Sequence, residues 1–187
     1  MNTATTAATT STTRTKWALD PSHSELAFKV KHLMISNVKG EFQKFNASIE
    51  AVGTDFNHAR IHATMDAAAI FTNDTNRDNH LRGADFFDAE KHPHLEFTGI
   101  RMEHVSGSDY KLTGELNIKG ITKPVTLDVE FGGITKDPYG NEKAGFSLSG
   151  KISRKDWDLN WNAALETGGV LVSDEVRINA EVQFVKQ

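Results

Sequence analysis

The stretch VRINAEVQF, residues 176–184, alternates apolar and polar side chains without interruption. Successive side chains of a β-strand point to opposite faces, so this stretch predicts a strand with one apolar face. The same period recurs in eight stretches along the chain, at residues 26–32, 45–49, 60–71, 95–99, 110–118, 125–131, 144–152 and 176–184. Eight strands joined mostly by short turns predict an all-β, antiparallel up-and-down sheet. Eight is also a number that closes into a barrel around one elongated ligand.

Length and composition fit one ordinary domain, with 187 residues of which 38% are hydrophobic. The net charge of -4 is spread over interspersed acids and bases, so we expect no nucleic-acid partner. No apolar run is long enough to cross a bilayer, and we expect a soluble protein without stable membrane insertion. The lack of cysteine excludes disulfides, thiolate nucleophiles and Cys-ligated metals.

The start of the chain, MNTATTAATTSTTRTK, is rich in Thr and Ala and contains no apolar block. We expect a disordered tail over residues 1–16 and one barrel domain over residues 17–187. A secretory signal needs a continuous apolar core after its basic start. The chain as written therefore predicts a cytoplasmic protein, or a periplasmic one if a leader has been removed.

The stretch NRDNHLRGADFFD, residues 76–88, combines charges, imidazole and aromatic rings in one short segment. Thr75 is a candidate N-cap, and Asp78 and Arg82 stand one turn apart, which predicts a helix between the third and fourth strands. The helix either plugs one end of the barrel with its charges paired or faces an anionic ligand head group. The second interpretation uses three basic side chains, Arg77, His80 and Arg82.

The inward faces of two strands leave further alternatives open. The third strand places Ala63, Ala67 and Ala69 on one face, where small residues make room for a guest or let bulky neighbours pack closely. His32 on the first strand also points inward, as a hydrogen-bonded core group or as a ligand contact.

Two connections differ from the short turns. Residues 33–40 predict a bend or a short helix, whereas residues 154–174 form a long loop of the kind that is often functional or mobile. Trp157 and Trp161 in this loop are four apart. They form either a turn that covers the barrel or an aromatic gate to its interior.

Motifs for catalysis are absent from the sequence. It contains no nucleophile elbow, phosphate loop or dinucleotide fingerprint, and no carboxylate pair stands out for acid–base work. Among eight histidines, only His92 and His94 have a plausible metal-ligand spacing, and we favour a surface position for them over a metal site. We therefore expect no enzyme, no catalytic residues, no metal and no cofactor.

Several motifs follow one another in a recognisable order from Trp17 to the C-terminus. They are DPSHS (20–24), VKHLMISNVKGEF (30–42), RDNHLRGADFFD (77–88), Phe97, GELNIKGITKPV (114–125), GF (145–146) and RKDW (154–157). This order resembles the YceI-like family of polyisoprenoid-binding proteins. The resemblance implies a lipocalin-like, extended eight-stranded antiparallel barrel with short helices that holds a long prenyl chain or other lipid. It also implies a homodimer, and for many members a periplasmic location.

The expected ligand is a polyprenyl diphosphate or an isoprenoid quinone, held for transport, storage or sequestration, with a link to the stress response. The alternatives are an enzyme acting on a hydrophobic substrate in the same cavity and an empty structural barrel. A prenyl tail that moves from bilayer to barrel exchanges one apolar surrounding for another, so head-group contacts must decide selectivity. The candidate ligand-binding residues are Phe28, Val30, His32, Ala63, Met65, Ala67, Ala69, Arg77, His80, Arg82, Phe86, Phe97, Leu116, Phe146 and Trp157.

Overall fold

The computed structural model describes residues 13–187, so most of the predicted tail lies outside the described residues. Within this range the sheet begins at Thr15, slightly before the predicted start of the barrel at Trp17. The last residues assigned to the tail therefore belong to the first strand.

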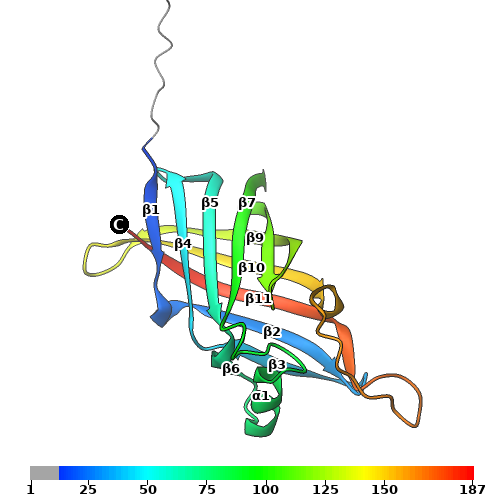
Figure 1. Cartoon of the computed structure of the whole chain (residues 1–187). Coiled ribbons are helices and arrows are strands. Elements are labelled where there is room, and N and C mark those ends of the chain that lie inside the picture. The colour runs from blue at the N-terminus through cyan, green and yellow to red at the C-terminus, as the bar shows by residue number, and fades with distance from the viewer. Residues whose placement is uncertain (1–12) are drawn as a thin grey trace, which may run out of the picture.

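The described chain is built mainly from β-strands (Figure 1). The strands are β1 (Thr15–Leu19), β2 (Glu25–His32), β3 (Ser36–Phe42), β4 (Phe45–Val52), β5 (Asp55–Asp66), β6 (Ile70–Phe71), β7 (His94–Ser106), β8 (Asp109–Ile118), β9 (Ile121–Lys136), β10 (Glu142–Ser153) and β11 (Val172–Lys186). The helices are the 3-10 turns η1 (Pro21–His23), η2 (Ala67–Ala69) and η3 (Arg154–Trp157), and the α-helix α1 (Thr75–Arg82).

Eight of these strands form a closed antiparallel ring in the order β1-β4-β5-β7-β8-β9-β10-β11, with β11 pairing back to β1. The predicted eight-stranded barrel is thus confirmed. The ring closes because β11 pairs with two partners along its length. Its end at Phe184–Lys186 pairs with β1, while its earlier residues pair with β2. Strands β2, β3 and β6 continue the sheet beyond the ring, as seen along the lower edge of Figure 1.

The extra strands arise because two long strands are bent. The chain through β1 and β2 is interrupted by η1, and the chain through β3 and β4 turns at Gln43 and Lys44. The bend predicted over residues 33–40 is confined to a turn at residues 33–35, since β3 already begins at Ser36. The predicted third strand also ends early, at Asp66, where the side chain of Asp66 accepts a hydrogen bond from Ala68 N and caps η2.

The bend between β1 and β2 is held by Asp20. Its main-chain N–H donates to Gln183 O at 2.8 Å, and its carboxylate lies 2.7 Å from Lys143 Nζ on β10 and 2.9 Å from His23 Nδ1. The Lys143 ammonium holds the pKa of Asp20 well below its ordinary value of 3.8, against the opposing effect of burial. Asp20 therefore connects the bend to two strands of the ring, to β10 through its carboxylate and to β11 through its main-chain N–H.

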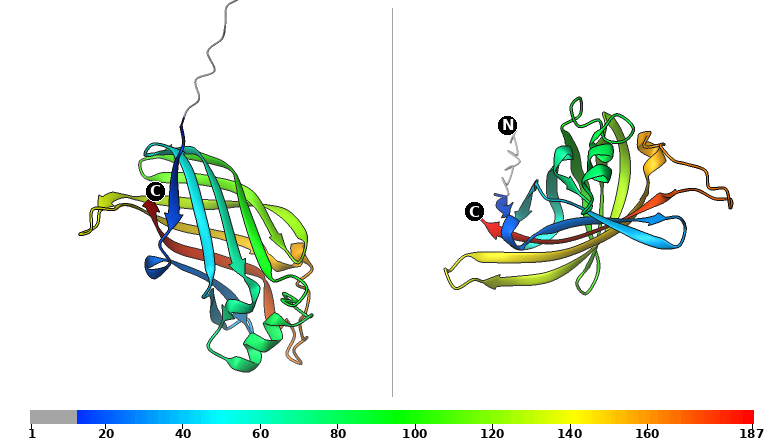
Figure 2. Two further views of the ribbon diagram at one scale, coloured as in Figure 1. Left: turned by 60° about the vertical axis from the view of Figure 1, so that its left-hand side comes forward. Right: turned by 90° about the horizontal axis from the view of Figure 1, so that it is seen from below.

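One end of the barrel interior is filled by aromatic side chains. Trp17 and Phe56 are fully buried with ring centroids 5.4 Å apart, and Phe56 lies 5.2 Å from Phe131 and 5.0 Å from Phe146. Such pairs combine large apolar burial with favourable tilted geometry. Because this end is packed, any internal space must lie toward the opposite end, where α1 sits below the strands (Figure 2).

Gly114 on β8 allows the interior rings to approach the wall. A Cβ built there would lie 2.4 Å from Phe97 Cζ and 2.5 Å from Thr98 O. We predict that Gly114→Ala lowers the free energy of unfolding by about 1–3 kcal/mol, because the clash involves main chain. Gly145→Ala on β10 is the control, since nothing lies within 4 Å of its added methyl, and it should change stability by less than about 1 kcal/mol. Urea unfolding measures both, and equal stabilities would contradict the crowding.

The low pKa of Asp20 predicts that the stability of the closed barrel falls at acid pH. A carboxyl whose folded-state pKa is depressed stabilises the fold above its unfolded pKa, and this contribution is lost as pH falls through the folded pKa. The wild type should therefore lose stability between about pH 5 and pH 2 more steeply than Asp20→Asn. Asp109→Asn, at the exposed first residue of β8, should keep the wild-type slope. Urea midpoints across this pH range provide the measurement, and parallel curves for wild type and Asp20→Asn would contradict it.

Candidate functional site

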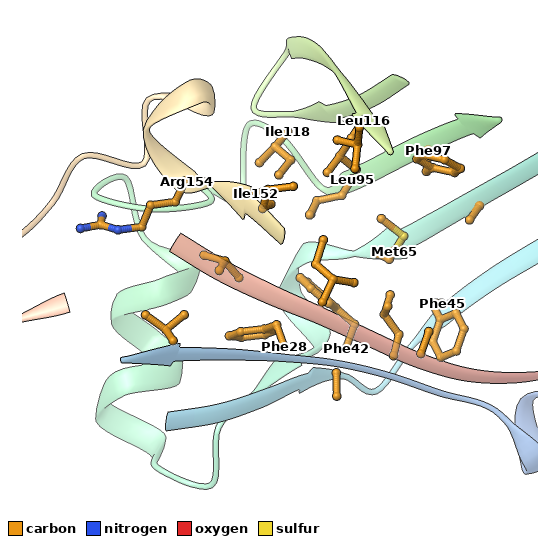
Figure 3. A pocket seen from close by; sticks show the side chains of 18 of the residues that line it. Phe28, Phe42, Phe45, Met65, Leu95, Phe97, Leu116, Ile118, Ile152 and Arg154 are labelled. Carbon is orange, nitrogen blue, oxygen red and sulfur yellow. The ribbon is translucent and has the colours of Figure 1, made fainter. Parts of the chain in front are cut away.

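The unfilled part of the barrel contains a cavity of about 580 Å³. Its walls are almost entirely aliphatic and aromatic side chains from strands on all sides, as the inward-pointing Phe28, Met65 and Leu116 illustrate (Figure 3). Eleven of the predicted residues line it, namely Phe28, Val30, His32, Ala63, Met65, Arg77, His80, Phe86, Phe97, Leu116 and Phe146. Alternation along the strands found eight of them because a barrel has only an inner and an outer face, whereas Arg77, His80 and Phe86 come from the predicted helical segment.

Four predicted residues lie outside the cavity wall. Ala67 and Ala69 belong to η2 instead of a strand, so the alternation that placed them inward does not apply there. Trp157 is buried but does not line the cavity, and its indole N–H donates to Leu116 O at 2.9 Å. Arg82 is directed at main chain, as shown below. For these four residues the sequence pattern did not predict the direction in which the side chain points.

The polar groups of the cavity wall gather near α1 and the loop after β10. They are Lys31, His32, Thr72, Asn76, Arg77, His80 and Arg154. No Asp or Glu is among the described residues that line the cavity. The cavity is therefore apolar along its length, and its polar portion carries only neutral and positive side chains.

Helix α1 is fixed by hydrogen bonds to the segment before it. Asp74, and not the predicted Thr75, is the N-cap, and its carboxylate accepts from Arg77 N at 2.9 Å. Buried Asp78 accepts from Thr72 N at 2.8 Å and from Thr72 Oγ1 at 2.6 Å. Arg77 Nε then donates to the same hydroxyl oxygen at 2.7 Å. The helical spacing indicated a pair between Asp78 and Arg82. In the structure Asp78 pairs with Thr72 instead.

Arg82 locks the helix to the barrel rim. Its Nε donates to Ala68 O at 2.8 Å, its Nη2 to Ile70 O at 3.1 Å and its Nη1 to Asn79 Oδ1 at 3.1 Å. These bonds occupy the guanidinium on main-chain and amide acceptors outside the cavity. Of the two interpretations of the helix, Arg82 follows the structural one, whereas Arg77 and His80 reach the cavity.

Three rings meet across the mouth of the cavity. His80 lies 5.1 Å from Phe86 and 4.7 Å from Trp161 between ring centroids, and Phe86 lies 5.6 Å from Trp161. His80 Nε2 is also 2.9 Å from Asp85 Oδ2. The cluster joins α1 to the long loop, so Trp161 occupies the place that a gate would need. The four-residue spacing of Trp157 and Trp161 left a covering turn and an aromatic gate open, and it did not predict that only Trp161 lines the cavity.

Arg154 is the buried cation that sequence reasoning missed. Its guanidinium donates to the carbonyl oxygens of Ser173 at 2.9 Å, Trp161 at 2.9 Å and Leu159. Figure 3 shows it turned away from the apolar side chains of the cavity. Burial lowers the pKa of Arg154 while Asp174, 3.9 Å away, opposes this, and an arginine stays protonated in either case. Arg154 thus organises the long loop and adds positive potential to the same end of the cavity.

The histidine pair predicted as a possible metal site does not form part of one. Across residues 13–187, no three His, Asp or Glu side chains come together as a metal centre would require. None of the helices within residues 13–187 has the length and apolarity needed to span a membrane.

Comparison with known proteins identifies close relatives of this architecture. Residues 17–184 match the YceI-like domain. A UPF0312 protein of Staphylococcus aureus is 40% identical over 171 residues, which cover 91% of this chain and 97% of that protein. The crystal structure of a Campylobacter jejuni YCEI protein is similar at 38% identity and a TM-score of 0.72, covering 84% of this chain and 90% of that one.

Two more distant structures share the fold. Burkholderia cenocepacia BcnA has 24% identity and a TM-score of 0.75, over 88% of this chain and 98% of its own. A domain from Saccharophagus degradans, described as polyisoprenoid binding, has 14% identity and a TM-score of 0.67, over 91% of this chain and 98% of its own. Together these structures confirm the lipocalin-like barrel.

The lock made by Arg82 can be tested by stability. We predict that Arg82→Gln lowers the free energy of unfolding by about 1.5–3 kcal/mol, because the carbonyls of Ala68 and Ile70 lose a charged donor. Arg60→Gln removes an arginine that is 72% exposed and 4.0 Å from Glu50, and it should change stability by less than about 0.5 kcal/mol. Thermal and urea unfolding of both variants make the comparison, and equal stabilities would refute the lock.

Proposed function

Because the chain belongs to the YceI-like family, we propose that it binds a long-chain isoprenoid or a related amphiphilic lipid inside the barrel and transports, stores or sequesters it. The observation that supports this most directly is the cavity itself, about 580 Å³ of space with apolar walls and polar groups near one end. An apolar tail fits the walls, and a polar head fits the end at α1. The ligand class named for the Saccharophagus degradans domain agrees with this assignment.

The apolar walls favour a hydrocarbon guest over water. An apolar cavity offers water too few hydrogen-bond partners, and an empty one deprives its lining of dispersion contacts. A tail that fills the space restores those contacts and removes its own surface from water. Since a bilayer offers the same tail a comparable environment, the tail contributes little to the choice between barrel and membrane.

The head group therefore decides what is taken from a membrane. Lys31, Arg77 and Arg154 bring positive charge to the polar portion of the wall. With no acidic residue among the described lining residues, this end favours an anionic head such as a diphosphate over a neutral one.

Binding is a better account of the cavity than catalysis. Thr72 supplies the one hydroxyl among the described lining residues, and it is bonded to Asp78 and Arg77. A hydroxyl engaged on both sides is poorly placed to act as a nucleophile. The polar groups present are suited to holding an anion, which supports a carrier or storage role.

Native mass spectrometry with two probes of equal tail length tests this function. We expect geranylgeranyl diphosphate and geranylgeraniol each to bind with a stoichiometry of one, with the diphosphate bound more tightly. Ala63→Phe, which places a ring in the cavity wall, should lower the affinity for both probes by at least about tenfold while the fold survives. Turnover of either probe would favour an enzyme, and absence of binding by both would refute the proposal.

The head-group preference has its own variant. We expect Arg77→Gln to reduce the affinity ratio of diphosphate to alcohol by about tenfold or more, the value of one charge-assisted hydrogen bond. Arg82→Gln is the matched control, because it removes an arginine of the same helix that does not line the cavity. If both variants change the ratio equally, general electrostatics and not the cavity contact sets the preference.

A further inference from the structure

A cluster of exposed apolar side chains forms the turn between β2 and β3. Leu33, Met34 and Ile35 are 37%, 50% and 84% exposed. The neighbouring loop adds exposed Val170 beside them, since Leu33 N donates to Leu171 O at 2.9 Å. We call these four residues the apolar tip. Figures 1 and 2 show the hairpin and the loop projecting together at one end of the molecule.

The backbone of the tip is unfavourable for the residues that occupy it. Leu33 and Met34 have φ of 52° and 61°, and Ile35 N donates to His32 O at 3.2 Å, which is the conformation of a type I′ turn. Such turns strongly prefer Asn-Gly, because positive φ crowds a bulky side chain. The sequence thus places large apolar groups where they are neither buried nor conformationally favoured. An outlier of this kind indicates a role outside folding.

Basic residues flank the apolar tip. Lys29, Lys31 and Lys39 are exposed on the same hairpin, and the stretch from residue 26 to residue 40 contains no Asp or Glu. Lys29 faces Lys39 across the strand pair. Lys39 pairs with Glu25 at 2.8 Å, whereas no acidic side chain in the described part of the chain lies within ion-pair distance of Lys29 or Lys31. The hairpin therefore presents a positive flank behind an apolar end.

The apolar tip lies directly beside the cavity mouth. Lys31 and His32 precede it on β2 and line the cavity, and Leu171 and Val172, which follow Val170, do the same. Trp161 of the mouth cluster belongs to the same loop. A surface that the tip contacts would therefore lie close to the opening through which a ligand enters.

We propose that the apolar tip docks the barrel on the surface of an anionic lipid bilayer. Apolar side chains at the boundary of the acyl region, with lysines at the level of the head groups, form the usual arrangement of a peripheral membrane contact. Charge complementarity favours this partner over a second copy of the chain, because a twofold contact at the tip brings the same basic flank against itself. Docking itself is independent of the proposed function, whereas its use for lipid transfer rests on it.

The test exploits the unfavourable turn. Replacing both central residues together, Leu33→Asn with Met34→Gly, installs the preferred type I′ sequence, so the variant should fold with an unchanged or higher melting temperature. Its binding to vesicles of phosphatidylcholine with phosphatidylglycerol should fall by at least about tenfold relative to wild type, because two apolar contacts are lost. Tyr139→Ser removes an apolar residue that is 90% exposed in the β9–β10 turn at the other end, and it should bind as wild type does.

Vesicle flotation gives the affinities, and three results support the docking. Wild type should bind the anionic vesicles, bind pure phosphatidylcholine more weakly, and lose affinity as salt is raised. Equal flotation of wild type and the double variant would overturn it. A second result would also overturn it: a wild-type dimer that dissociates in the double variant, with no binding to vesicles. That result would assign the apolar tip to contact with a second copy of the chain.

A final measurement separates this inference from the proposed function. Geranylgeraniol dispersed in detergent reaches the cavity without a membrane, so the double variant should bind it as tightly as wild type does. Normal uptake from detergent with reduced vesicle binding supports the docking role. Vesicle binding without uptake of the probe by wild type would refute the proposed function and leave docking supported. Loss of uptake from detergent in the variant would overturn a role confined to docking.

Discussion

The pairing of β1 with β11 is the constraint on which the rest of the structure depends. It joins the first and last strands of the chain and leaves the eight-stranded ring without a free edge. A closed ring satisfies its main-chain hydrogen bonds within the wall, so the interior can be apolar throughout. The contact is short, covering Trp17–Leu19 against Phe184–Lys186, because β11 must also pair with β2. The bend at Asp20 allows the chain to serve both pairings.

Closure divides the interior into a packed end and a hollow end. Near the packed end, Trp17, Phe56 and Phe131 fill the space with large rings. Toward α1 the strands spread and the side chains line a space that they do not fill. A protein interior normally reaches crystal-like density, so a cavity of about 580 Å³ is a departure that costs stability unless a guest occupies it. That departure is the physical basis of the proposed binding function.

The α1 end shows how similar side chains separate into structural and ligand-facing roles. Asp78 and Arg82 are taken up by Thr72 and by the carbonyls of the rim, which hold the helix in place. Arg77 and His80, on the same helix, line the cavity, although Arg77 also donates to Thr72 and His80 lies beside Asp85. The long loop is organised in the same way, with Arg154 fixing its backbone while Trp161 closes on His80. The proposed membrane contact lies beside this mouth, so the end of the barrel that opens to the ligand is also the end that would face the bilayer.

The sequence by itself determined the strands, the barrel and most of the cavity wall, because alternation assigns each side chain to one of two faces and a closed sheet has only one inside. Tertiary structure decided the rest. Ala67 and Ala69 do not line the cavity because they belong to a 3-10 turn capped by Asp66. The two-residue alternation of a strand does not predict such a turn. Arg82 and Arg77 both donate to main-chain carbonyls, Arg82 to Ala68 O and Ile70 O and Arg77 to Thr72 O, and only the folded structure shows that Arg77 also lines the cavity. Charge and spacing can nominate such residues, but the partners that fix their direction come from segments that meet only after the ring has closed.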